Sequence, residues 1–281
     1  SSHKSDLRMQ DVETYVSHNK NSPKYSKISK ILRDNEQLFD WRPLEKILDA
    51  GCGPGDVTVN ALIPWLPPDF QLVMGVDVSP TMVDHALAAH ASNKLTFATW
   101  DIEQDVTDVL KNGKFASGFD KVFSFYVLHW LQDLGKGVRN LHSLLKTRGQ
   151  ALLFFPVDRI FQRTYKKVRA SETWSRYFQT VTRKIPPFPK EDPLAEFENM
   201  LIDAGFEIMK SEIRDHIDDF RSVEDVTALV ESLDPDIAHV PVDLKASYLR
   251  DCLQVMDQME VLNLERTSIK QKMLLCVIRK P

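Results

Sequence analysis

The chain has little cysteine, no long apolar run and no excess of charge of one sign. Its 281 residues include three scattered cysteines, Cys52, Cys252 and Cys276, which do not form the pattern of a disulfide framework or a zinc cluster. No stretch approaches the roughly 18 consecutive apolar residues of a membrane span. Lys and Arg number 36 against 40 for Asp and Glu, a net charge of −4, whereas nucleic-acid-binding proteins are usually basic. We therefore expect a cytoplasmic protein in a reducing setting, with no bound metal, nucleic acid, membrane span or obligate protein partner.

Strand-like and helix-like segments alternate between residues 46 and 156. Ser79 followed by Pro80 predicts the start of one helix, because serine caps helices and proline is tolerated at the first helical position. Asp56 similarly predicts the cap of an earlier helix. Alternation of this kind indicates an α/β protein with a doubly wound, mostly parallel sheet. The expected strands are 46–50, 71–77, 95–101, 119–126 and 150–156.

A glycine-rich turn, Asp49-Ala-Gly51-Cys-Gly53-Pro-Gly55, follows the first strand. Glycines let a ligand approach the backbone closely, and the start of the next helix offers free N–H groups. The spacing differs from the Gly-x-Gly-x-x-Gly of dinucleotide sites. A buried aspartate beside this loop suits an amino group better than a phosphate, which favours S-adenosylmethionine as the cofactor. A nicotinamide cofactor and a purely structural turn are the alternatives.

Acidic residues follow the next two strands. Asp77 comes about 20 residues after Gly55, the spacing at which an acid binds a ribose diol. Asp101 ends the third strand, where an acid can accept from the exocyclic amine of adenine, although it could also cap a helix. The predicted cofactor-binding residues are Asp49, Gly51, Gly53, Gly55, Asp77, Val78, Met82, Asp101, Ile102 and Ser124.

The rhythm of strands and helices changes after Pro156. We expect a helix at 192–204, a strand at 206–217, helices at 222–232 and 242–262, and a last strand at 272–279. The expected architecture is a seven-stranded sheet with an inserted helical cap. Its parts are an N-terminal helical arm (1–45), a cofactor-binding core (46–157), a helical cap or substrate region (158–190 and 218–265) and the remaining core elements (191–217 and 266–281).

The glycine loop and the acids after strands two and three resemble the motif series of class I S-adenosylmethionine-dependent methyltransferases. Further stretches carry a closer resemblance: Asp101-Ile-Glu-Gln-Asp105, Phe119-Asp-Lys-Val-Phe-Ser-Phe-Tyr-Val-Leu-His-Trp130, Glu172-Thr-Trp174, Pro187-Phe188, Glu191-Asp-Pro193 and Ala204-Gly-Phe206. Through these stretches, the sequence resembles the arthropod juvenile hormone acid (farnesoic acid) methyltransferases over nearly the whole chain from about residue 11. That resemblance implies a Rossmann-like methyltransferase fold and methyl transfer to the carboxylate of a sesquiterpenoid acid, such as juvenile hormone acid or farnesoic acid. The N-terminal arm lacks the glutamine that this family places near the substrate carboxylate.

His129 and Trp130 follow the fourth expected strand and are predicted to bind the methyl acceptor. The Trp130 indole N–H can donate to a carboxylate, and His129 can do so if suitably oriented. Ordinary packing is the alternative for both. A carboxylate is already ionised at neutral pH, so we expect no general base among the catalytic residues.

An aromatic and basic segment follows residue 158. Trp174 is predicted to contact the substrate, and an apolar pocket could also include Phe161, Tyr165, Phe178 and Phe188, although such aromatics are more often core residues. The cluster of Arg159, Arg163, Lys166, Lys167 and Arg169 is expected on a solvated helix face, or as an attractor of an anionic substrate. Two other functions stay open. One is methylation of a different small acceptor, such as a polyacid held by several arginines, and the other is an inactive S-adenosylmethionine-binding protein.

Overall fold

The computed structural model describes residues 12, 15–16, 24–111, 113–181 and 192–281. These residues fall into two compact units. Of the described residues, the sheet unit contains those within 25–157, 192–214 and 273–281, and the helical unit contains those within 12–24, 158–181 and 215–272.

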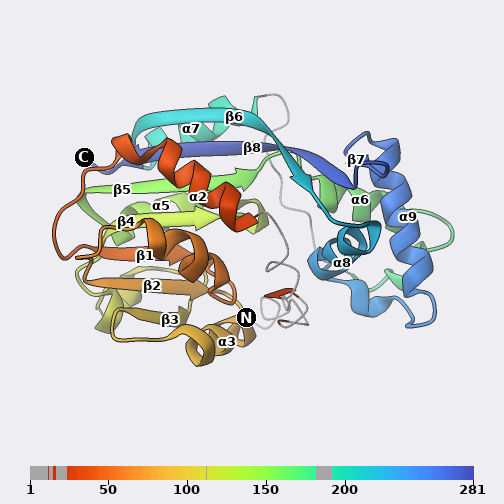
Figure 1. The fold of residues 1–281 in the computed structure, drawn as a ribbon, viewed down its shortest axis with the longest axis horizontal. Coiled ribbons are helices and arrows are strands. Elements are labelled where there is room, and N and C mark those ends of the chain that lie inside the picture. The colour runs from red at the N-terminus through yellow and green to blue at the C-terminus, as the bar shows by residue number, and fades with distance from the viewer. Residues whose placement is uncertain (1–11, 13–14, 17–23, 112, 182–191) are drawn as a thin grey trace. The chain divides into compact units, whose positions relative to one another are not determined.

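The sheet unit is built on one mixed sheet (Figure 1). Within the described residues the strand order is β3-β2-β1-β4-β5-β8-β6, with the two-residue strand β7 paired to β8. Neighbours from β3 to β5 are parallel, and β5 and β8 are antiparallel. The doubly wound, mostly parallel sheet expected from the sequence is therefore confirmed, with one short strand more than the seven expected. The strands are β1 (Lys46–Ala50), β2 (Leu72–Asp77), β3 (Leu95–Thr99), β4 (Phe119–Phe125), β5 (Leu145–Pro156), β6 (Glu207–Asp219), β7 (Leu262–Asn263) and β8 (Ser268–Arg279).

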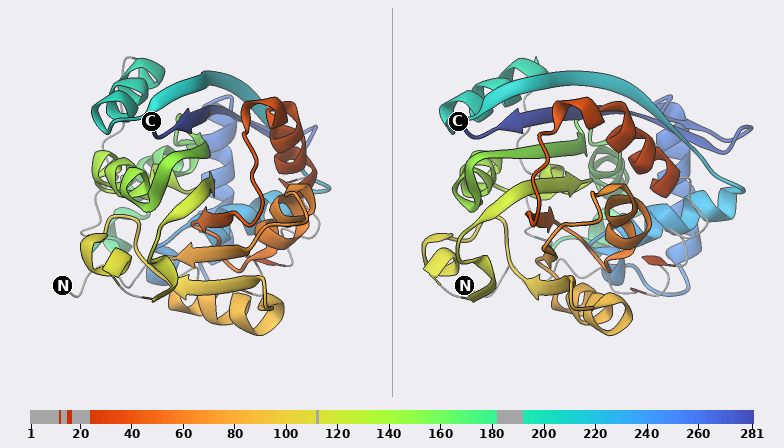
Figure 2. Two further views of the ribbon diagram at one scale, coloured as in Figure 1. Left: turned by 90° about the vertical axis from the view of Figure 1, so that its left-hand side faces the viewer. Right: turned by 60° about the vertical axis from the view of Figure 1, so that its left-hand side comes forward.

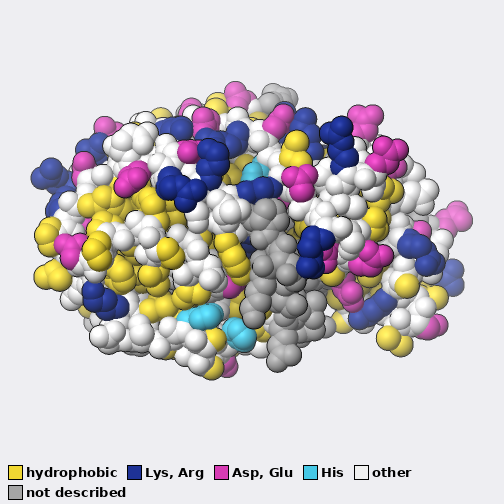
Figure 3. All heavy atoms as spheres, in the orientation of Figure 1, with side chains coloured by type: hydrophobic (Ala, Val, Ile, Leu, Met, Phe, Trp, Pro, Cys, Tyr) yellow, Lys and Arg dark blue, Asp and Glu magenta, His cyan; other side chains and the backbone are white. Residues whose placement is uncertain are grey.

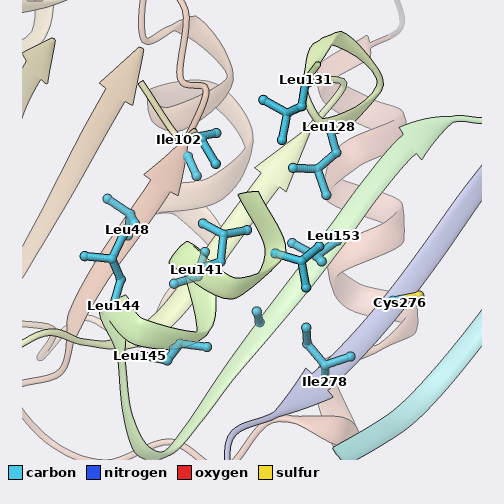
Figure 4. Close-up of a cluster of buried hydrophobic side chains, with 14 of the residues drawn as sticks. Leu48, Ile102, Leu128, Leu131, Leu141, Leu144, Leu145, Leu153, Cys276 and Ile278 are labelled. Carbon is cyan, nitrogen blue, oxygen red and sulfur yellow. The ribbon is translucent and has the colours of Figure 1, made fainter. Parts of the chain in front are cut away.

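Helices cover both faces of this sheet (Figures 1 and 2). Because successive strand residues point to opposite faces, each central strand contributes side chains to a hydrophobic core on either face of the sheet. Leu153 and Phe155 of β5 pack with α5 and α7, whereas Leu152 and Phe154 pack with α2 and α3. Figure 4 shows the first of these cores, where leucines of α5 meet side chains of β1, β5 and β8. The helices are α2 (Lys24–Asp34), α3 (Pro80–His90), α4 (Thr107–Lys111), α5 (Leu134–Leu144) and α7 (Pro193–Asp203).

The strand order brings two loops together at the carboxyl ends of the parallel strands, which we call the carboxyl edge of the sheet. The chain leaves β1 toward β2 and β3, and then crosses back to β4 on the other side of β1. Asp49 of β1 is in register with Gly75 of β2 on one side and with Phe123 of β4 on the other. Ligands of open α/β sheets bind at such a switch point. The glycine loop after β1 and the His129–Trp130 segment after β4 both start there.

The amino edge of the sheet, formed by the amino ends of its parallel strands, holds a buried ion pair. Lys121 and Glu45 lie 2.8 Å apart, with side-chain exposures of 1% and 3%. The Lys121 ammonium also donates to the Asp40 carbonyl at 2.8 Å and lies 5.1 Å from the centre of the Trp41 ring. Burial raises the pKa of the Glu45 carboxyl and lowers the pKa of the Lys121 ammonium. This edge thus stabilises its buried carboxylate with a buried cation.

The helical unit has its own hydrophobic core, formed by α6 (Ile160–Arg169), α8 (Val223–Leu233) and α9 (Lys245–Gln258). Arg169 of α6 pairs with Asp234 and, at 2.7 Å, with Asp236. The Tyr248 hydroxyl donates to the second oxygen of Asp234 at 2.8 Å. The helix expected at 242–262 ends four residues early, at Gln258, and β7 follows it.

Several whole-chain expectations can be compared with this structure. Cys52, Cys252 and Cys276 are all free and buried. Acidic and basic side chains are interspersed over the face shown in Figure 3, as the near-balance of charges implies. Across the described part of the chain, no helix combines the length and the apolar character needed to cross a membrane.

Candidate active site

The glycine loop takes a backbone conformation that only glycine adopts readily. Gly51, Gly53 and Gly55 have φ of 84°, 54° and 84°. The loop is held against β2 because the Gly51 and Cys52 amides donate to the Val76 carbonyl at 2.7 and 2.9 Å. Among the described atoms, none lies within 4 Å of the position that a Cβ would take on Gly53. The backbone is therefore open to a ligand at Gly53.

Asp77 ties the end of β2 to this loop. Its carboxylate accepts from the Gly53 amide at 2.9 Å and from the Ser79 amide at 2.9 Å. Burial raises the pKa of Asp77, and the hydrogen bonds from the backbone oppose that shift. Each carboxylate oxygen has a second lone pair, so the group can still accept from two hydroxyls. Ser79 caps α3 as expected, since its hydroxyl accepts from the Met82 amide at 3.4 Å.

Asp49 lies under the loop and is 2% exposed. The Thr58 hydroxyl donates to it at 2.6 Å. Ser124 of β4 is 1% exposed and donates to the Ala50 carbonyl at 2.8 Å, which links β4 to the end of β1. The prediction that Asp56 caps the following helix is wrong. Asp56 is the first residue of that helix, one position after the cap, and its carboxylate accepts from the Tyr25 hydroxyl at 2.6 Å.

The segment after β3 is fixed by side-chain hydrogen bonds to its backbone. Asp101 accepts from the Glu103 amide at 2.9 Å. Asn140 of α5 donates to the Ile102 and Gln104 carbonyls at 2.7 and 2.6 Å. Ile102 is buried, and Asp101 is half-buried at the edge where β1 and β2 also end. No local sequence pattern predicts this role for Asn140.

The segment after β4 packs directly on the glycine loop. A Cβ on Gly51 would lie 2.1 Å from a methyl carbon of Val127, so this side chain fills the space that glycine leaves. The short 3-10 turn Leu128–Trp130 follows at once. His129 is 6% exposed, Trp130 is half-buried, and their ring centres lie 4.9 Å apart.

The aromatic residues of the helical unit form part of its core. Trp174 is 3% exposed, and its indole N–H donates to Asp251 at 2.6 Å. Phe161, Tyr165 and Phe178 belong to or pack against the same cluster. Phe188 lies outside the described residues. Contact of Trp174 with substrate stays a prediction.

The basic segment is only partly solvated, so the expectation of one solvated face is wrong. Arg163, Lys166 and Lys167 are exposed. Arg159 is 6% exposed, and burial lowers the pKa of its guanidinium to about 10. Arg169 is the residue that pairs with Asp234 and Asp236. Helical periodicity alone does not reveal these two acids, which follow the C-terminal end of α8.

These groups fit an amino-acid nucleoside. The glycine backbone is open at Gly53, a carboxylate with spare lone pairs ends β2, and a buried acid lies beside the loop. Cys52 fills the gap beside Gly75, where a Cβ would lie 2.9 Å from its sulfur, and burial raises the pKa of its thiol. It therefore has no nucleophilic character.

Comparisons with known proteins agree with this assignment. Residues 48–151 match the model of a methyltransferase domain. The chain is 31% identical to juvenile hormone acid O-methyltransferase of Drosophila melanogaster over 82% of this chain and 78% of that protein. It is 29% identical to the Bombyx mori enzyme of the same name, over 83% of this chain and 81% of the relative.

A solved structure shows the same fold. Phosphoethanolamine N-methyltransferase 2 of Haemonchus contortus, in complex with phosphomonomethylethanolamine and S-adenosylhomocysteine, has a TM-score of 0.57 at 15% identity. The match covers 100% of this chain and 61% of that one. Fold and site together define an S-adenosylmethionine-dependent methyltransferase. Within that class, the chain belongs to the juvenile hormone acid O-methyltransferase family.

Sequence reasoning missed three contacts of the site. Thr58 follows the last loop glycine by one helical turn, a position from which a hydroxyl can reach Asp49. Tyr25 reaches Asp56 from α2, and no local pattern signals this contact. Val127, after β4, packs on Gly51, after the neighbouring strand β1. The one sequence feature that pointed to Val127 was its place in the stretch ending at Trp130 that resembles the family.

Proposed function

We propose that the protein esterifies the carboxylate of a small apolar acid, and that a sesquiterpenoid such as juvenile hormone acid or farnesoic acid is its substrate. The observation that carries the proposal is the packing of Val127 on Gly51. It brings the His129–Trp130 turn to the loop that we assign to the cofactor. Membership of the juvenile hormone acid O-methyltransferase family supports a carboxylate as the acceptor.

We assign the cofactor to the carboxyl edge of the sheet. Gly51, Gly53 and Gly55 would admit it to the backbone, Asp77 would accept from the ribose hydroxyls, and Asp49 would face the amino group. Val78, Met82, Asp101, Ile102 and Ser124 complete the proposed site around the ends of β2, β3 and β4. Bound S-adenosylmethionine supplies an activated methyl group, which passes to the carboxylate oxygen as the sulfur leaves with the bonding electron pair.

The contribution of the chain is alignment. Trp130 would donate its indole N–H to one acceptor oxygen and leave the other free to attack, and His129 would hold the same carboxylate from its neighbouring position. An ionised acceptor needs no general base. Trp174 is assigned to the substrate chain on the family resemblance.

The test is methyl transfer from isotope-labelled S-adenosylmethionine to a panel of acids, read by mass spectrometry. The panel contains farnesoic acid, juvenile hormone acid, saturated fatty acids and a tricarboxylate. Esters from the terpenoid acids alone would support the proposal. An ester from the tricarboxylate would favour the polyacid alternative, for which the buried Arg159 is a candidate ligand. Cofactor binding without any ester would exclude carboxyl methylation of these classes and favour the binding-protein alternative.

A matched pair of variants assigns the acceptor role. Trp130→Phe keeps an aromatic ring but removes the indole N–H and one of the two fused rings, and we expect KM for the acid to rise about tenfold while cofactor affinity is unchanged. Trp65→Phe makes the same chemical change elsewhere in the sheet unit and is the control. The Trp65 indole N–H is buried and donates to no group among the described residues, so KM should be unchanged.

A further inference from the structure

The backbone of Tyr126 is left-handed at the point where β4 ends. Its φ is 61°, a value that non-glycine residues adopt rarely and at an energetic cost. Tyr126 is not in a hairpin or a helix cap, where such conformations are common. It stands between the last residue of β4 and the 3-10 turn of His129 and Trp130.

Contacts on both sides hold Tyr126 in this conformation. Its amide donates to the Phe154 carbonyl of β5 at 2.8 Å, and its ring lies edge-on to Phe154 with centres 5.4 Å apart. Directly after the left-handed residue, Val127 turns onto Gly51, and its carbonyl accepts from the Trp130 amide at 2.9 Å. One backbone conformation thus sets both the contact with the glycine loop and the start of the turn.

We propose that Tyr126 is a positioning residue for methyl transfer, whose left-handed backbone places Val127 on the glycine loop and fixes the turn that presents His129 and Trp130. The inference rests on the proposed function, because it assigns that turn to the acceptor and that loop to the cofactor. An extended residue at this position would continue β4 along the sheet and carry Val127 away from Gly51. The strained backbone of Tyr126 therefore helps to hold the glycine loop and the His129–Trp130 turn in contact.

Substitutions at position 126 separate the backbone from the side chain. Tyr126→Gly, Tyr126→Ala and Tyr126→Val all remove the ring, but the left-handed conformation is easy for glycine, costly for alanine and most costly for a β-branched residue. Tyr126→Phe keeps ring and backbone preference. We expect kcat/KM to be highest in the Phe variant and to fall in the order Gly, Ala, Val. Each step should be about tenfold, the factor that corresponds to about 1.4 kcal/mol of backbone strain.

Cofactor affinity, measured by calorimetry without an acceptor, is the second readout. The dissociation constant of S-adenosylmethionine should rise in the same order, because Val127 leaves the glycine loop as the left-handed state is depopulated. Arg148→Val is the matched control. Arg148 is also left-handed, with φ of 65°, but it is exposed and lies in the first residues of β5, where the register with β4 is irregular. That variant should lower the melting temperature and leave cofactor affinity unchanged.

Equal losses of kcat/KM and cofactor affinity in the Gly, Ala and Val variants would assign the effect to the ring and overturn the inference. A Val variant with the activity and affinity of the wild type would also overturn it. If the Val variant does not fold, the Gly and Ala variants decide: equal cofactor affinities overturn it, and weaker binding by Ala supports it. If no acid is methylated, the proposed function fails, and cofactor affinity still tests the role of Tyr126.

Discussion

The two edges of the sheet handle buried carboxylates in opposite ways. At the amino edge, Glu45 and Asp120 are paired with Lys121 and Lys146 at 2.8 and 2.7 Å. At the carboxyl edge, Asp77 and Asp101 accept from backbone amides, and Asp49 accepts from a hydroxyl. A carboxylate paired with a cation has its charge neutralised locally, whereas one held by amides or by a hydroxyl keeps its net negative charge. The comparison suggests that charge at the amino edge serves stability and charge at the carboxyl edge serves a ligand.

The largest expected effect is a loss of folding stability at the amino edge. Lys121→Met removes one partner of a pair with exposures of 1% and 3%, and the free energy of unfolding should fall by about 3–5 kcal/mol in urea titrations. The double variant Lys121→Met, Glu45→Leu should recover most of that loss. Lys30→Met breaks the exposed Lys30–Asp34 pair, which solvent screens, and should leave the free energy of unfolding unchanged within error. Equal costs for the buried and exposed pairs would contradict the comparison.

The next effect is at the carboxyl edge. Gly51→Ala places a Cβ 2.1 Å from Val127 at a φ of 84°, so overpacking adds to backbone strain. We expect a loss of roughly 2–4 kcal/mol, shared between stability and cofactor affinity. Gly113→Ala is the control, since φ there is 58° and no described atom lies within 4 Å of the new Cβ. It should lower the melting temperature slightly, and a matching loss of cofactor affinity would refute the role of the loop.

Asp77→Ala tests the edge charge more finely. Loss of hydrogen bonds to an ionised group should weaken cofactor binding by about 1–3 kcal/mol, measured by calorimetry. Asp120→Ala removes the acid that accepts from the Lys46 amide and from Lys146, and should lower stability while leaving cofactor affinity unchanged. Unchanged affinity in Asp77→Ala would exclude the ribose assignment.

The smallest effect is on pH dependence. Burial lowers the pKa of His90, beside Gly55, and of His142, where Lys280 adds to the shift. Below the unfolded pKa of 6.5, the unfolded chain therefore binds more protons than the folded one, and stability falls as pH decreases. Both side chains are partly exposed, so solvent screening keeps each contribution well below the limit of about 1.4 kcal/mol per pH unit. Melting curves of His90→Gln and His142→Gln between pH 7 and 5 should each show a shallower fall than the wild type.

Most strands could be predicted because parallel strands buried on both faces form continuous apolar runs. β1 and β2 match the expected bounds to within one residue. The glycine loop was equally clear, since its function depends on local backbone freedom. Partners far apart in the chain were not predictable. Tyr25 donates a hydrogen bond to Asp56, and Asp234 and Asp236 form ion pairs with Arg169. The left-handed Tyr126 was hidden as well, because a tyrosine carries no sequence signal for positive φ.

The position of β8 has a consequence for synthesis of the protein. β8 lies between β5 and β6 in the sheet but follows both in the chain. A nascent chain that has emerged as far as Asp219 therefore carries two strands whose shared neighbour has not yet been translated. Their unpaired backbone edges and apolar faces are open to other chains during that interval. We expect ribosome-bound chains to depend on chaperones until residues 268–279 leave the exit tunnel.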